Sequence, residues 1–126
     1  MVIDAIAIDA ETLVERIRVI LDDKKAQDIT IIDVRGTSTV TDYTIIASGM
    51  STPHIRALYE EVQHRLKQEG IACYRRSGET DGGWMVLDYV NVVIHLFVPE
   101  VREFYALERL WDDVAALREQ PADGED

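Results

Sequence analysis

Hydrophobic positions along the chain switch between helical and strand periodicity, and their order predicts a mixed sheet with helices. Apolar residues recur at helical spacing in three segments, and shorter apolar runs lie between them. The predicted helices cover about 10–26, 52–70 and 100–118, and the predicted strands cover 28–34, 43–49, 71–77, 84–88 and 91–98. This order predicts an α/β (α+β) domain, a mixed sheet of about five strands flanked by helices.

Capping residues mark the ends of the first two helices. Asp9 is a plausible N-cap for the first helix. Thr52 can cap the second helix, Pro53 suits its first position and Gly70 ends it. The run "DITIIDV" (28–34) that follows the first helix is apolar and β-branched on both faces, which favours a central, buried strand.

The fourth and fifth predicted strands form a hairpin whose two faces differ. A two-residue turn at Tyr89–Val90 or at Val90–Asn91 changes the pairing but keeps the same residues on each face. The aliphatic face, which we expect in the core, holds Met85, Leu87, Val92, Ile94, Leu96 and Val98. The other face, here called the mixed face, holds Trp84, Val86, Asp88, Asn91, Val93, His95 and Phe97.

The mixed face has two interpretations. Trp84 can pack beneath a helix of the same chain while Asp88 makes a local hydrogen bond. Alternatively, the face is an exposed docking patch, because an aromatic residue ringed by a few polar groups is typical of interfaces. Gly82 and Gly83 would then let a backbone approach closely beside Trp84.

The length of 126 residues suits one domain, which we place at 1–118, followed by a disordered acidic tail at 119–126. Cys73 is the only cysteine, so a reducing, cytoplasmic setting is expected. No apolar run approaches the roughly 20 residues that span a bilayer, so we expect no membrane contact. Asp4 and Asp9 interrupt the apolar N-terminus, which favours a helix lead-in or an edge segment over a signal peptide.

The formal net charge of −11 bears on the choice of partner. Nucleic-acid binding rests on Lys and Arg meeting phosphates, so little direct RNA contact is expected. Two basic pairs, at 24–25 and 75–76, are local exceptions and suggest solvated surface. A basic protein partner would be attracted by the same charge, chiefly through faster encounter, although solubility alone also explains it.

The sequence offers no positive case for catalysis, for a metal or for another cofactor. Two-metal phosphoryl transfer uses two carboxylates spaced two residues apart on one strand face. The residue two positions after Asp33 is Arg35, and the residue two positions after Asp88 is Val90, so neither strand presents such a pair. His54 and His64 lie on nearly opposite sides of one helix, and His95 is alone on its strand. Cys73 is interpreted as a half-buried strand residue.

Three segments together resemble the ribosomal silencing factor family, also called Iojap or RsfS. They are "DVRGTSTVTDYTIIASGMSTPHIRALYEEV" (33–62), "GGWMVLDYVNVVIHLF" (82–97) and "REFYALERLW" (102–111). The resemblance covers about residues 10 to 114, in order. It implies a fold related to nucleotidyltransferases but without their catalytic acids. It also implies binding to the large ribosomal subunit through ribosomal protein L-fourteen, which would block joining of the small subunit and repress translation or protect a late assembly state.

The resemblance and the residue pattern together select the candidate partner-binding residues. The predicted set is Trp84, Asp88, His95, Tyr89, Asn91, Gly82 and Tyr105. Relatives commonly have glycine and aspartate after the "DY" dipeptide, where this chain has Val90 and Asn91, so the turn and an acidic contact differ here.

Two other functions are kept as alternatives. The first is a nucleotide-handling enzyme on the same fold that recruits unusual acids such as Asp33, Asp42 and Asp81. The second is a homodimeric adaptor that uses the mixed face for self-association. Ligand-induced thermal shifts would identify the enzyme, and mass measurement across concentration would identify the dimer.

Overall fold

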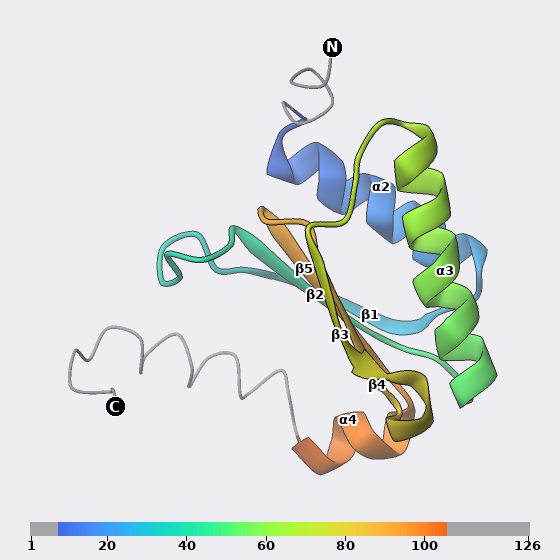
Figure 1. Ribbon diagram of the computed structural model, residues 1–126. Coiled ribbons are helices and arrows are strands. Elements are labelled where there is room, and N and C mark those ends of the chain that lie inside the picture. The colour runs from blue at the N-terminus through green and yellow to red at the C-terminus, as the bar shows by residue number, and fades with distance from the viewer. Residues whose placement is uncertain (1–7, 106–126) are drawn as a thin grey trace.

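The computed structural model describes residues 8–105, which fold into a five-stranded sheet with helices (Figure 1). In chain order the elements are α2 (Ala10–Asp23), β1 (Gln27–Asp33), β2 (Tyr43–Ser48), α3 (Thr52–Gln68), β3 (Arg75–Glu79), η1 (Thr80–Gly82), β4 (Trp84–Asp88), β5 (Val92–Phe97) and α4 (Pro99–Tyr105). The predicted α+β fold is confirmed. The rest of the predicted last helix, the N-terminal lead-in before residue 8 and the acidic tail lie outside the described residues.

Local capping defines both long helices. The Asp9 side chain accepts a hydrogen bond from the Thr12 backbone N–H over 2.8 Å and begins α2, as predicted. Helix α3 is capped by Ser51 instead of Thr52. It ends at Gln68, and Gly70 then adopts a positive φ of 83° at the exit.

The strand order is β1-β2-β5-β4-β3, with β2 and β5 parallel and the other pairs antiparallel. The prediction that the first strand is central is therefore wrong, because β1 is an edge strand and Ile31 is exposed on it. The apolar residues on both faces of β1 are explained by the hydrophobic cluster on each side of the sheet and not by a central position in the sheet. Ile29 packs towards the main core and Ile32 packs on the opposite face, so both sides of this edge strand are partly covered.

The third strand also lies later than predicted, at 75–79 instead of 71–77. The apolar residues at 71–73 lie at the exit of α3 and outside the strand ladder. The Ile71 N–H donates to the Leu66 carbonyl over 2.8 Å, and the Ile71 side chain is buried in the main core. All five residues of β3 are exposed at the other edge of the sheet.

Helices α2 and α3 pack together on one side of the sheet (Figure 1). Fully buried side chains from both helices and from the central strands meet there, among them Ile17, Leu21, Ile45, Leu58, Leu87 and Ile94. The predicted aliphatic face of the hairpin is part of this core, which leaves the mixed face on the opposite side of the sheet. A second, smaller cluster lies on that side and contains Ile46 and Phe97, with Ile32, Trp84 and Val101 packed against it.

Candidate partner-binding face

The β4–β5 hairpin uses the later of the two predicted turns. Trp84 pairs with Phe97, Val86 with His95 and Asp88 with Val93, so the two-residue turn is Val90–Asn91. The partition of side chains between the two faces is confirmed. On the mixed face, His95 is therefore the direct cross-strand neighbour of Val86 and lies beside Ile46 of β2.

The turn places a β-branched residue in an unfavourable backbone conformation. Val90 has a φ of 75°, in the left-handed region that favours glycine. The Asn91 N–H donates to the Tyr89 carbonyl over 2.9 Å, and the Asp88 carboxylate accepts a hydrogen bond from the Val90 N–H over 2.7 Å. Asp88 thus holds the strained turn closed, as the local interpretation of this residue expected.

Three rings form a cluster at the other end of the mixed face. The rings of Trp84 and Phe97 lie 4.9 Å apart, and those of His95 and Phe97 are stacked 6.0 Å apart. The Trp84 indole N–H donates to Nδ1 of His95 over 3.2 Å. Phe97 is fully buried and His95 is 7 % exposed, whereas Trp84 is only half-buried. Trp84 is therefore the member of the cluster that a partner can reach.

Burial sets the charge of the imidazole. Desolvation lowers the pKa of His95 from 6.5 to about 4, so the ring is neutral at physiological pH. The indole N–H can only donate, so Nδ1 must accept and the proton of the neutral ring lies on Nε2. His95 positions the indole and contributes no cation to the face.

The start of α4 is fixed to the edge of the sheet by Arg102. Its guanidinium donates to the Asp28 carbonyl over 2.7 Å, to Ser48 Oγ over 2.9 Å and to Thr30 Oγ1 over 2.9 Å. Arg102 is only 8 % exposed. Sequence reasoning missed this role, because three acceptors from β1 and β2 converge on one side chain only in the folded chain.

Gly83 allows the close approach of α4 to the hairpin. Its φ is 78°, and an added Cβ would lie 2.7 Å from Val98 Cγ2 and 3.1 Å from Val101 Cγ2. Its carbonyl also accepts a hydrogen bond from the Val98 N–H over 3.0 Å. Gly82, the predicted site residue, has open space around it and is exposed.

The accessible part of the mixed face has an apolar centre and a polar rim. Val86, Val93 and Trp84 are half-buried, and β3 adds the exposed side chains of Arg75 and Glu79. Trp84 and Val86 also line a shallow hollow of about 360 Å³, together with Ser77, Gly78, Glu79 and Gly82. This composition is typical of protein–protein interfaces, where aromatic and aliphatic groups are surrounded by charges.

The structure separates the predicted site residues. Trp84 and Gly82 line the same hollow, and the carboxylate of Asp88 lies further along the face, 3.6 Å from the Arg75 guanidinium. Asn91 lies at the hairpin tip, where its carbonyl accepts hydrogen bonds from the Asp42 and Tyr43 N–H groups.

Two other predicted residues fall outside this face. Tyr89 was predicted to contact a partner, and this is corrected. It follows Asp88 on the opposite face and is 6 % exposed within the main core. The side chain of Tyr105 lies outside the described part of the structure.

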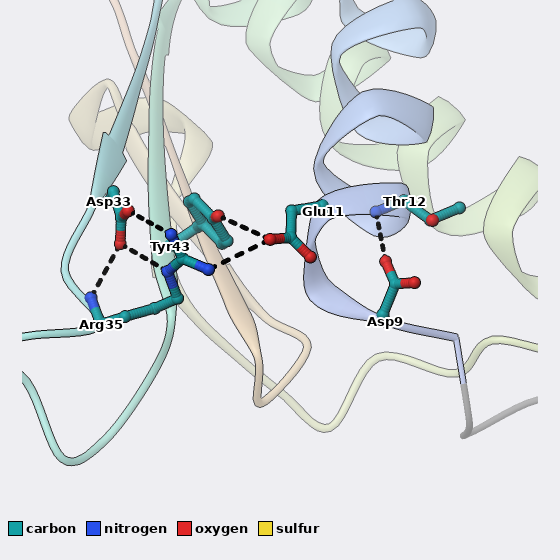
Figure 2. Close-up of polar contacts among 6 residues, drawn as sticks. All are labelled: Asp9, Glu11, Thr12, Asp33, Arg35 and Tyr43. Atoms are coloured by element: carbon teal, nitrogen blue, oxygen red, sulfur yellow. Dashed lines mark hydrogen bonds and ion pairs between the residues drawn. The ribbon is translucent and has the colours of Figure 1, made fainter.

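Of the three acids considered for nucleotide chemistry, Asp33 and Asp42 are near neighbours at one end of β1 and β2, and Asp81 lies apart from both. Figure 2 shows Arg35 between Asp33 and Glu11. The guanidinium lies 2.7 Å from the Asp33 carboxylate and 3.1 Å from that of Glu11. Hydrogen bonding to Arg35 lowers the pKa of Asp33, so this acid is already engaged with a cation. Asp81 belongs to η1, at the opposite end of the sheet from Asp42. Within residues 8–105, no three His, Cys, Asp or Glu side chains come together in a way that could hold a metal ion.

One further histidine has a local structural role. His54 serves the local structure, because Nδ1 accepts from the Met50 N–H over 2.8 Å and Nε2 lies 2.7 Å from the Lys24 carbonyl. None of the helices in the described residues is long and apolar enough to cross a membrane.

Comparison with known proteins agrees with the fold and the sequence motifs. Residues 7–126 match the protein family described as "Ribosomal silencing factor during starvation". The chain is 38 % identical to the ribosomal silencing factor of Zymomonas mobilis over 82 % of its own length and 77 % of that protein. It is 35 % identical to the mouse protein named "Mitochondrial assembly of ribosomal large subunit protein 1", over 82 % of this chain and 45 % of the mouse protein. A crystal structure of a Chromobacterium violaceum protein superposes with a TM-score of 0.79 at 30 % identity, covering 83 % of this chain and 88 % of that one.

Proposed function

The chain belongs to the ribosomal silencing factor family, and from this membership we propose that it binds the large ribosomal subunit through ribosomal protein L-fourteen. The mouse relative is named for assembly of the large subunit of the mitochondrial ribosome, which supports the choice of subunit. The bound protein blocks association with the small subunit by occupying space at the subunit interface. This represses translation or protects a late assembly state, and it requires no turnover.

The observation that carries the proposal is the half-buried Trp84 on a sheet face opposite the main core. Its indole is oriented by His95 and packs on Phe97, so the ring is held in place before a partner arrives. Truncation of a preorganised aromatic anchor at the centre of an interface costs about 2 kcal/mol or more of binding free energy. Val86 and Val93 are half-buried and extend the apolar area from the ring cluster towards the hairpin turn.

Charge supports a protein partner. The net charge of −11 opposes general adhesion to ribosomal RNA and accelerates encounter with a basic ribosomal protein. The contribution to the association rate falls as ionic strength rises, because salt screens charges over about 10 Å at 0.1 M. Apolar burial around Trp84 is affected much less by salt, so it dominates the lifetime of the complex.

The experiment is reassociation of purified ribosomal subunits on sucrose gradients with and without the protein. Three variants are compared with the parent: Trp84→Ala, Val86→Lys, and the control Val19→Lys. Val19 is an exposed valine on α2, away from the mixed face, so the control introduces the same charge elsewhere. We expect the parent and Val19→Lys to keep the subunits apart and to sediment with the large subunit.

Trp84→Ala and Val86→Lys should lose both activities while they retain the thermal unfolding of a folded protein. Val86→Lys keeps the test decisive if truncation of the indole disturbs the ring cluster. Normal anti-association activity in both variants would refute the mixed face as the docking surface. Full subunit joining in the presence of the parent would refute the proposed function itself.

A further inference from the structure

A basic hollow lies between α3 and the segment that connects it to β3. Its volume is about 370 Å³, and its walls are formed by Glu60, Gln63, His64, Lys67, Ala72, Cys73 and Arg76. The four residues from α3 recur at helical spacing and therefore form one stripe on that helix. Arg76 belongs to the basic pair at 75–76 that the sequence pattern singled out.

Arg76 is held in the hollow by an amide and not by a carboxylate. Its Nε–H donates to Gln63 Oε1, and Gln63 Nε2 in turn donates to the Tyr59 carbonyl over 3.1 Å. The amide is thus oriented by the helix backbone, and it fixes the guanidinium plane against α3. Within the described residues, Arg76 has no ion pair with a carboxylate. Its Nε–H is used by Gln63, and its two Nη groups can donate hydrogen bonds to a bound anion.

Arg76 differs in this respect from most other arginines of the described residues. Five of those arginines form ion pairs with carboxylates: Arg16, Arg18, Arg35, Arg65 and Arg75. In residues 8–105, Lys67 likewise has no carboxylate partner, although it lines the same hollow as Arg76. The hollow is thus lined by two cations that have no ion pair within the described residues, together with one carboxylate, that of Glu60.

The thiol in the wall does not cancel this charge. Burial raises the pKa of Cys73, and its Sγ–H donates to the Arg75 carbonyl over 3.3 Å. The group is therefore a neutral thiol at physiological pH, and a reactive thiolate is not expected. Glu60 supplies one carboxylate to the lining, which can accept a hydrogen bond from a ligand hydroxyl or amine.

The chemistry of the lining specifies the kind of ligand. A guanidinium with a fixed plane presents paired N–H donors that match two oxygens of a phosphate, and an ammonium adds a point charge. The volume falls within the range of small-molecule sites. We propose that the hollow between α3 and residues 72–76 binds a phosphate-bearing small molecule through Arg76 and Lys67. The mixed face lies on the other side of the sheet from α3, so this site and the docking surface can be occupied together.

The test is an amide chemical-shift titration of the full chain at constant ionic strength. The probes are inorganic phosphate, adenosine 5′-monophosphate and adenosine, with chloride as the reference salt. We expect saturable shifts at residues 60–67 and 72–76 with one or both phosphate probes and none with adenosine. Equal affinity for the two phosphate probes identifies a free anion as the ligand, and tighter binding of the monophosphate identifies a phosphate ester.

Three variants locate the binding groups. Arg76→Gln and Lys67→Gln should each weaken phosphate binding about tenfold, the loss expected when a charge-assisted hydrogen bond is removed. Lys25→Gln removes the same charge outside the hollow and should bind like the parent. Lys67 is exposed, so its variant tests the site even if Arg76→Gln alters the packing of the connecting segment. Equal binding by all three variants, equal shifts with adenosine, or no saturable shift with either phosphate would overturn the proposal.

Discussion

The Trp84 indole N–H donates to Nδ1 of His95 across 3.2 Å, so the residue proposed to meet a partner is oriented by a buried neutral imidazole. The bond joins β4 to β5 across the mixed face, diagonally between the register pairs Trp84–Phe97 and Val86–His95. Because the imidazole is buried, its protonation is coupled to folding, and this coupling gives the first prediction.

His95 should make the stability of the domain depend on pH. Burial lowers its pKa from 6.5 to about 4, so the unfolded chain binds the extra proton between these values and the folded chain does not. The stabilisation is complete above pH 6.5 and is lost as pH falls towards 4, to an extent on the order of 3 kcal/mol. Urea unfolding at several pH values should show a steeper acid loss for the parent than for His95→Gln. Parallel curves for the two proteins would contradict the assignment, since carboxylate titration is common to both.

The strained turn should make Val90→Gly a stabilising substitution. A valine at a φ of 75° is disfavoured, whereas glycine adopts this conformation readily, so we expect a gain of about 1 kcal/mol after the entropy of the unfolded glycine is included. Val40→Gly is the matched control, because Val40 is an exposed loop valine without a positive φ, and it should be slightly destabilising. Chemical denaturation measures both. A loss of stability in Val90→Gly comparable to that of the control would show that the turn stores no strain.

The two adjacent glycines should respond differently to alanine. Gly83→Ala introduces a Cβ 2.7 Å from Val98 Cγ2 at a φ of 78°, and we expect destabilisation of about 2 kcal/mol or more. Gly82→Ala meets open space and should leave the unfolding midpoint nearly unchanged. Thermal unfolding of the two variants side by side is sufficient, and similar midpoints would rule out the close approach of α4 to the hairpin.

Arg102 should contribute strongly to stability although it lies near the end of the described chain. Arg102→Met leaves Ser48 Oγ and Thr30 Oγ1 without this donor, and we expect a cost of about 3 kcal/mol. Arg18→Met provides the comparison, because the Arg18–Glu15 pair is exposed to solvent and its loss should change stability little. Equilibrium unfolding that gives equal losses for both variants would exclude the role assigned to Arg102.

Much of the fold follows from local patterns that a sequence displays directly. The alternation in residues 84–88 and 91–98 identifies a hairpin with one aliphatic and one mixed face, because side chains alternate strictly along a strand. The proline and glycine punctuation around α3 marks its limits to within two residues. The resemblance to the silencing factor family comes from the same segments, and the family comparison confirms it.

Errors arose where a local pattern has more than one tertiary explanation. The β-branched run of β1 suits a central strand, but it also suits an edge strand that is partly covered on both faces. The apolar residues at 71–73 suit a strand, but they lie at the exit of a helix, where Ile71 packs into the core. Tyr89 was assigned to the partner surface by its place in a motif, whereas its position in the alternation puts it in the core.

The sequence by itself determined the order of the elements, the division of the hairpin into two faces and the family of the protein, because these depend on residue periodicity and on contiguous motifs. Only the tertiary structure decided which strands lie at the edges, that Arg102 fixes α4 to β1 and β2, and that Arg76 and Lys67 line one hollow. The first two relationships join residues far apart in the chain, and the third depends on how the segment after α3 folds back against that helix. They are set by the packing of whole elements, which no local periodicity encodes.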